Sequence, residues 1–110
     1  MAYSEQLAER IRDALDGRPG IVERKMFGGI AWMLEGNMAC GVIGEDLLVR
    51  LAPEDGAAAQ AQEGVGPMQF TGRRPMRGFV LVDGGAITED GELGRWVDAG
   101  ADFALTLPSK

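Results

Sequence analysis

The chain has 110 residues, one cysteine, no histidine and a formal net charge of −6 at pH 7. This length predicts one domain, residues 1–110, with enough surface to bury for a core that needs no disulfide or metal. The missing histidine excludes Ser-His-Asp and Cys-His nucleophiles, and one cysteine cannot supply the four nitrogen or sulfur ligands of a structural zinc site.

The first predicted element is a helix over residues 4–16. Ser4 is a suitable N-cap, and apolar residues recur behind it at helical spacing. Gly17 is a typical helix stop. The pattern indicates an amphipathic helix that packs one face on the core.

Antiparallel strands are predicted next, because β-branched, aromatic and methionine residues dominate positions 21–51. We expect strands at about 21–27, 30–34 with its partner 38–43, and 47–51. Turns should fall at 35–37 and 44–46. The number of strands in this segment is three or four, depending on whether Gly28-Gly29 is a bulge or a turn.

A short helix and two more strands are expected in the second half. Pro53 suits the first position of a helix, which we expect to end at "GVGP" (64–67). One strand should begin at Met68 and Phe70, and "GFVLV" (78–82) should form the other. The segment "GRRP" (72–75) between them is predicted to be a turn.

The last predicted element is a helix capped by Thr88 or Asp90. Its packed face should consist of Leu93, Trp96, Val97, Gly100, Ala101 and Ala104. Glycine in this face indicates close approach to the sheet. The order helix, three strands, helix, two strands, helix predicts an α+β fold with a mainly antiparallel sheet.

The segment "RKMFGGIAWMLEGNMACGV" (24–42) is rich in glycine and sulfur. It does not fit a phosphate-binding P-loop, because Lys25 precedes the glycines and no helix follows them. Its sulfur atoms would suit Cu(I), but strand alternation sends them to both sheet faces, so core packing is favoured. Cys40 has apolar neighbours and is expected to be inert. We therefore expect no metal and no cofactor.

Basic residues form the candidate interaction patch. Arginine recognises carboxylates and phosphates well, and the alternative is that these residues pair with the seventeen acids or solvate the sheet. The acids cluster at turns and helix starts, where capping explains them, so no catalytic pair and no enzyme is expected. The patch consists of Arg24, Lys25, Arg50, Arg73, Arg74 and Arg77.

The expected compartment is the cytoplasm. No apolar run approaches the roughly 20 residues of a membrane-spanning helix, and no signal peptide is recognised before the first helix. The acidic balance opposes attraction to anionic membranes and non-specific attraction to nucleic acid. We expect no membrane partner.

Four segments together resemble the TfoX/Sxy N-terminal domain family, and more narrowly its short single-domain members. They are "RKMFGGIAWMLEGNMACGV", "LLVRLAPE", "PMQFTGRRPMRGFVLVD" and "RWVDAGADFALTLP". The resemblance implies the α+β order given above, similar to type III secretion chaperones, and no catalytic residues. The positions that match the family motif, most simply structural, are Met26, Phe27, Gly28, Gly29, Gly72, Pro75 and Gly78.

The resemblance also implies a regulatory role. The family is named after regulators of natural competence, which promote expression of DNA-uptake genes with a cyclic-AMP receptor protein. Those regulators carry a second, C-terminal domain that these 110 residues do not contain. The leading hypothesis is a non-enzymatic module that binds a protein partner in transcription regulation and forms a homodimer through its sheet. The alternatives are a nucleic-acid-binding regulator that uses the arginine patch and a small-molecule-binding domain.

Overall fold

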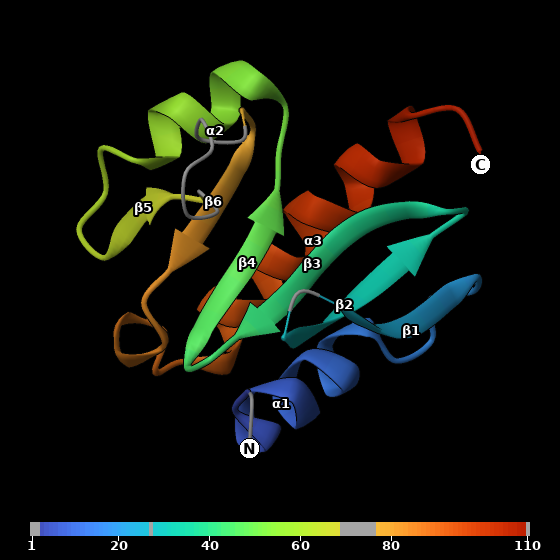
Figure 1. Cartoon of the computed structure of the whole chain (residues 1–110), viewed down its shortest axis with the longest axis horizontal. Coiled ribbons are helices and arrows are strands. Elements are labelled where there is room, and N and C mark those ends of the chain that lie inside the picture. The colour runs from blue at the N-terminus through green and yellow to red at the C-terminus, as the bar shows by residue number, and fades with distance from the viewer. Residues whose placement is uncertain (1–2, 27, 69–76, 110) are drawn as a thin grey trace.

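The computed structural model describes residues 3–26, 28–68 and 77–109. Six strands form one antiparallel open sheet in the order β1-β2-β3-β4-β6-β5 (Figure 1). This confirms the predicted α+β class. The elements are α1 (Glu5–Leu15), β1 (Ile21–Met26), β2 (Gly29–Leu34), β3 (Asn37–Ile43), β4 (Asp46–Arg50), α2 (Pro53–Ala59), β5 (Val65–Pro67), β6 (Phe79–Val82), the 3₁₀ turn η1 (Gly84–Ala86) and α3 (Asp90–Thr106).

Helix α1 begins and ends where its sequence predicts. The Ser4 hydroxyl oxygen accepts a hydrogen bond of 3.1 Å from the backbone N–H of Leu7, which is a typical N-cap. Gly17 follows the helix with a φ of +87°, a conformation that glycine adopts without strain.

The first group contains four strands rather than three. β2 and β3 form a hairpin through Glu35 (φ +52°) and Gly36 (φ +85°), two positive values that a type I′ turn requires. Gly28 lies between β1 and β2 with a φ of +76°, so the glycine pair marks a turn. The irregularity of the sheet lies instead between Trp32 and Met33, where the pairing with β3 shifts.

The second half differs from the prediction at one strand. α2 has Pro53 at its first position as expected, and β6 matches the predicted strand at 78–82. The strand expected from Met68 onward begins earlier, because Val65–Pro67 forms β5 by pairing with β6. Proline is tolerated there because β5 is an edge strand. Phe70 and the "GRRP" turn lie outside the described residues.

Helix α3 begins one residue away from both expected caps. Glu89 is the N-cap, and its side chain makes no capping hydrogen bond, so the assignment to Thr88 or Asp90 was wrong. The predicted close approach at Gly100 is confirmed, since a Cβ there would lie 2.3 Å from the carbonyl oxygen of Ala39. Among residues 3–26, 28–68 and 77–109, no helix is long and apolar enough to cross a membrane.

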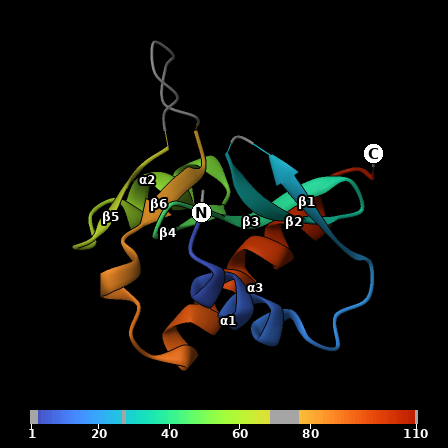
Figure 2. The same cartoon turned by 60° about the horizontal axis from the view of Figure 1, so that its bottom comes forward.

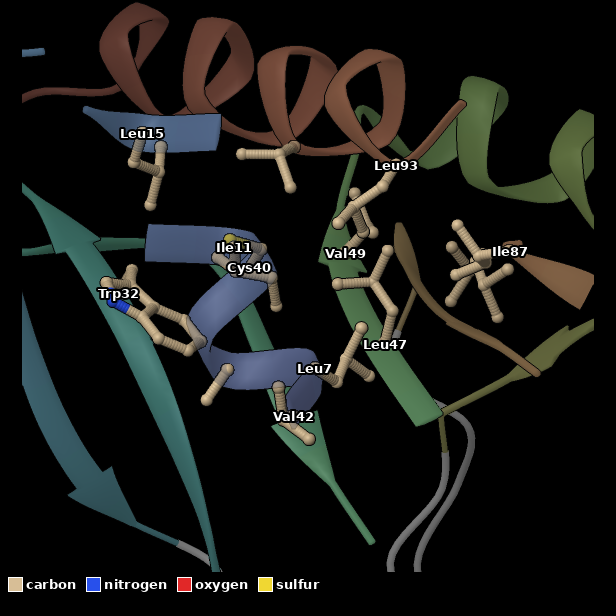
Figure 3. Close-up of a cluster of buried hydrophobic side chains, with 14 of the residues drawn as sticks. Leu7, Ile11, Leu15, Trp32, Cys40, Val42, Leu47, Val49, Ile87 and Leu93 are labelled. Atoms are coloured by element: carbon tan, nitrogen blue, oxygen red, sulfur yellow. The ribbon is translucent and has the colours of Figure 1, made fainter. Parts of the chain in front are cut away.

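Helices α1 and α3 cover the same face of the sheet (Figure 2). Alternate residues of the strands point into this layer, so Trp32, Cys40 and Leu47 meet side chains from both helices (Figure 3). The fully buried large side chains gather here, which leaves the opposite face of the sheet without either helix. They include Ile11, Ile30, Trp32, Leu47, Val49, Val80, Val82, Ile87 and Leu93.

Candidate functional site

The face of the sheet turned away from α1 and α3 is called the open face below. Figure 1 looks onto it, with α3 behind β3 and β4. Its residues alternate along each strand with those of the core and are matched across the sheet by the strand register. From β1 to β6 they are Val22, Arg24, Met26, Ala31, Met33, Met38, Gly41, Ile43, Asp46, Leu48, Phe79 and Leu81.

Apolar side chains dominate the open face. Ala31 and Leu48 are buried at its centre, although neither belongs to the core beneath α1 and α3. Around them lie half-buried side chains, and Val22 at one edge is 53% exposed. A partly exposed apolar surface of this kind is typical of a protein interaction site, and methionine adapts readily to different partners. The half-buried apolar residues are Met26, Met33, Met38, Ile43, Phe79 and Leu81.

Arg50 occupies a defined position at the end of β4. Its guanidinium carbon lies 5.3 Å from the ring centroid of Phe79, its cross-strand neighbour, and 5.8 Å from that of Phe103 on α3. Both distances are within the range of a cation–π contact. Because Phe103 belongs to α3, the Arg50 guanidinium lies beside the helix layer at the end of β4 and is not a free charge on the open face.

The arginines on the helix side are already paired. Arg10 binds Asp90 at 3.0 Å, Arg12 binds Glu23 at 2.6 Å, and Arg18 lies 3.3 Å from Asp98. In contrast, the described part of the chain provides no ion pair for the patch members that it contains. These are Arg24, Lys25, Arg50 and Arg77.

The described patch residues occupy two regions. Arg24 and Lys25 lie side by side in the edge strand β1, so they point to opposite faces, and only Arg24 points to the open face. The Arg50 guanidinium lies against Phe103 of α3 instead. Arg77 is exposed beside Gly78, whose carbonyl accepts the Leu51 N–H at 2.7 Å, and this places Arg77 near the end of β4. The predicted members Arg73 and Arg74 lie outside the described residues.

The motif glycines have geometry that a side chain would disturb. A Cβ on Gly29 would lie 2.1 Å from the carbonyl oxygen of Val42. Gly78 has a φ of +83°, and its Cβ would lie 2.4 Å from the carbonyl oxygen of Leu51. Met26 is half-buried on β1. The remaining motif positions, Phe27, Gly72 and Pro75, are outside the described residues.

A polar network joins α1 to the first hairpin, and the sequence analysis missed it. Trp32 Nε1 donates a 3.0 Å hydrogen bond to Glu23, which also binds Arg12, and Arg12 in turn pairs with Glu9. The hydrogen bond from Arg12 lowers the pKa of Glu23 despite the partial burial that opposes it, and Trp32 adds to the lowering. The pairing of β1 with β2 could have indicated the contact, because its register places Glu23 opposite Trp32.

The remaining chemical groups offer no arrangement for catalysis within the described residues. Cys40 is fully buried, and burial raises the pKa of its thiol to about 12. The described side chains contain no group of three metal-ligating residues. A pocket of about 320 Å³ beside the start of α1 contains one carboxylate and one guanidinium. It is lined by Ser4, Gln6, Leu7, Arg10, Glu45, Gly84, Gly85 and Thr88.

Comparison with known proteins identifies the domain. Residues 13–104 match the family described as the TfoX N-terminal domain, a span that contains the whole sheet and most of α3. No curated protein and no solved structure matches the chain. The match covers most of the 110 residues. The chain therefore belongs to the TfoX N-terminal domain family, a family of competence-related regulatory domains.

Proposed function

We propose that the chain is a non-enzymatic regulatory domain that acts in the cytoplasm and binds a protein partner through the open face. The observation that carries the proposal is the combination of half-buried apolar side chains with unpaired charge on this face. Met33, Met38 and Leu81 supply the apolar surface, and Arg24 supplies the charge.

The partner segment that fits this surface is an amphipathic helix with an acidic flank. The sheet already packs a helix, α3, on its other face, and helix-on-sheet layering is a stable way to bury an apolar stripe. Leucine-like side chains would pack on the methionines and Leu81. A carboxylate beside them would reach Arg24, where a charge-assisted hydrogen bond is strong.

The local charge of the open face supports an acidic partner. The protein carries a net charge of −6, yet the described charged residues of this face, Arg24 and Asp46, sum to zero. Asp46 accepts a hydrogen bond of 3.4 Å from the Gly84 N–H, which leaves Arg24 as the charge that a partner would meet.

Direct binding of nucleic acid is the second candidate function. It is favoured by three exposed cations that form no ion pair with any described residue, Arg24, Lys25 and Arg77. Because neighbouring strand residues point to opposite faces, Arg24 and Lys25 would not both contact one duplex lying on the open face. This candidate predicts an affinity that falls steeply with added salt.

Fluorescence anisotropy with three labelled probes tests the proposal. The first is a peptide of about 18 residues, roughly 27 Å as a helix, with leucines at helical spacing and glutamates elsewhere. The second has lysines in place of the glutamates, and the third is a DNA duplex of similar length. The proposal predicts binding of the Leu/Glu peptide alone. Binding of the duplex alone would favour the second candidate, and binding of none would overturn both.

Matched variants locate the binding surface. Arg24→Gln and Leu81→Asp change the open face, and each should weaken binding of the Leu/Glu peptide about tenfold. Leu105→Asp is the control, because Leu105 is 52% exposed on α3, away from the open face. Equal binding by all three variants, with circular dichroism showing that each is folded, would contradict the assignment of the surface.

A further inference from the structure

Strand β1 presents an unpaired edge of the sheet. It pairs with β2 on one side, and no described residue pairs with its other side. Residues 22–25 are exposed, and Val22 is one of two large apolar side chains that the described residues expose. An edge strand with free backbone groups is a template for another strand.

The backbone groups of β1 that face outward follow from its register. Met26 pairs with Gly29 across a two-residue connection, and the closing pair of such a hairpin is hydrogen-bonded. Hydrogen-bonded and non-bonded pairs then alternate, so Arg24 and Met26 direct their amides toward β2. Glu23 and Lys25 direct theirs toward the free edge.

We infer that two copies of this chain pair edge to edge through antiparallel β1 strands, with Arg24 on the two-fold axis. In this register Glu23 lies opposite Lys25 of the second copy, and Val22 lies opposite Met26 of the second copy. Because of the two-fold symmetry, the Glu23–Lys25 pair and the Val22–Met26 pair each occur twice. Both charged pairs lie on the helix side, and both apolar pairs lie on the open face.

Charge selects this register over its neighbours. A register shift by two residues in one direction places Glu23 opposite Glu23 of the second copy. A shift by two residues in the other direction places Lys25 opposite Lys25 of the second copy. Each of the three registers contains one like-charge pair, but only the register centred on Arg24 also contains two Glu23–Lys25 pairs of opposite charge. Glu23 also belongs to a cluster with Glu9 and Arg12 whose two carboxylates and one guanidinium sum to −1, so Lys25 of the second copy would neutralise it.

This pairing goes beyond the proposed binding of a partner and leaves the open face free. The helices of both copies would lie on one side of a continuous sheet, and the two open faces would lie side by side on the other. The one unfavourable contact is Arg24 opposite Arg24 of the second copy, which keeps the association weak.

Cysteine cross-linking tests the register. In Arg24→Cys the two sulfurs would meet across a non-hydrogen-bonded pair, with Cα atoms about 4.5 Å apart, which suits a disulfide. Lys25→Cys is the control, because its Cα atoms would be roughly 8–9 Å apart, beyond disulfide reach. The native Cys40 is buried and does not compete. Mild oxidation should cross-link Arg24→Cys at least about tenfold faster than Lys25→Cys.

Sedimentation equilibrium from about 10 μM to about 1 mM measures the association itself. The inference predicts a monomer–dimer equilibrium in the wild type, little change in Lys25→Arg, and a Kd raised about tenfold or more in Lys25→Glu. A monomer at all concentrations, equal cross-linking of both cysteine variants, or unchanged association of Lys25→Glu would overturn it. Peptide binding by the same samples reports separately on the open face, so the two proposals fail independently.

Discussion

Among single side chains, Glu23 connects three elements of the fold. It accepts a hydrogen bond from Trp32 on β2 and binds Arg12 on α1, while its own backbone belongs to the edge strand β1. Trp32 is almost completely buried, so its indole N–H depends on this carboxylate for a partner. The network fixes the position of α1 beneath the first hairpin.

Replacement of Glu23 by alanine should lower the free energy of unfolding by about 1–3 kcal/mol, because the buried indole N–H of Trp32 loses its acceptor. Urea denaturation followed by tryptophan fluorescence measures this change. Glu9→Ala is the matched control, since Glu9 pairs with Arg12 at the exposed surface and should contribute less than about 1 kcal/mol. Equal effects of the two substitutions would show that the contact with Trp32 is not what stabilises the fold.

The pH dependence of stability provides a second test of the same carboxylate. Its pKa is lower in the folded protein than in the unfolded chain, because Arg12 donates to the ionised form. The stabilisation is therefore present above the unfolded pKa and is lost as pH falls through the folded pKa. The difference in free energy of unfolding between wild type and Glu23→Gln should be largest near neutral pH and should shrink below about pH 4. A constant difference would contradict this.

At the scale of elements, local patterns were sufficient wherever a segment carries its own signal. Ser4 and Gly17 delimit α1, and the stripe of α3 correctly indicated the contact at Gly100. β5 could not be recognised in the same way, since Val65–Pro67 becomes a strand only by pairing with β6. Glu35 gave no signal either, because the hairpin imposes its positive φ.

The candidate site was predictable only in part, because it depends on contacts between segments that are distant in the sequence. Arg50 could be named from composition, but its two aromatic neighbours come from β6 and α3, which lie far away in the sequence. The apolar character of the open face follows from strand alternation once the register is known. Which charges remain unpaired depends on tertiary packing and could not be read from residue types.

The contact between α3 and the sheet leads to a prediction about two glycines in the same helix. Gly100→Ala should destabilise the protein by about 1–3 kcal/mol, because its Cβ would overlap the carbonyl of Ala39. Gly94→Ala should instead stabilise it by about 0.5–1 kcal/mol, since nothing lies within 4 Å of that Cβ and alanine favours the helix. Thermal and urea unfolding of both variants check the opposite signs. A stabilising Gly100→Ala would show that α3 can move away from the sheet.

For the molecule as a whole, the sheet separates a structural side, which buries the core, from surfaces that are available for binding. Its helix side buries the core and contains the paired arginines, while the open face and the β1 edge retain apolar surface and unpaired charge. The proposed partner occupies the open face, and the inferred second copy occupies the edge. The two surfaces are adjacent, so a dimer would present two docking faces side by side, which would raise the apparent affinity for a partner with two segments.

The most direct test of the account is an amide chemical-shift map of the ¹⁵N-labelled protein during titration with the Leu/Glu peptide. The account predicts that the largest changes occur at open-face positions such as Met33, Leu48 and Leu81. Exposed α3 positions such as Asp98 and Leu105 should change little. Changes confined to α1 and α3, or to the pocket beside Thr88, would contradict the claim that the open face is the docking surface.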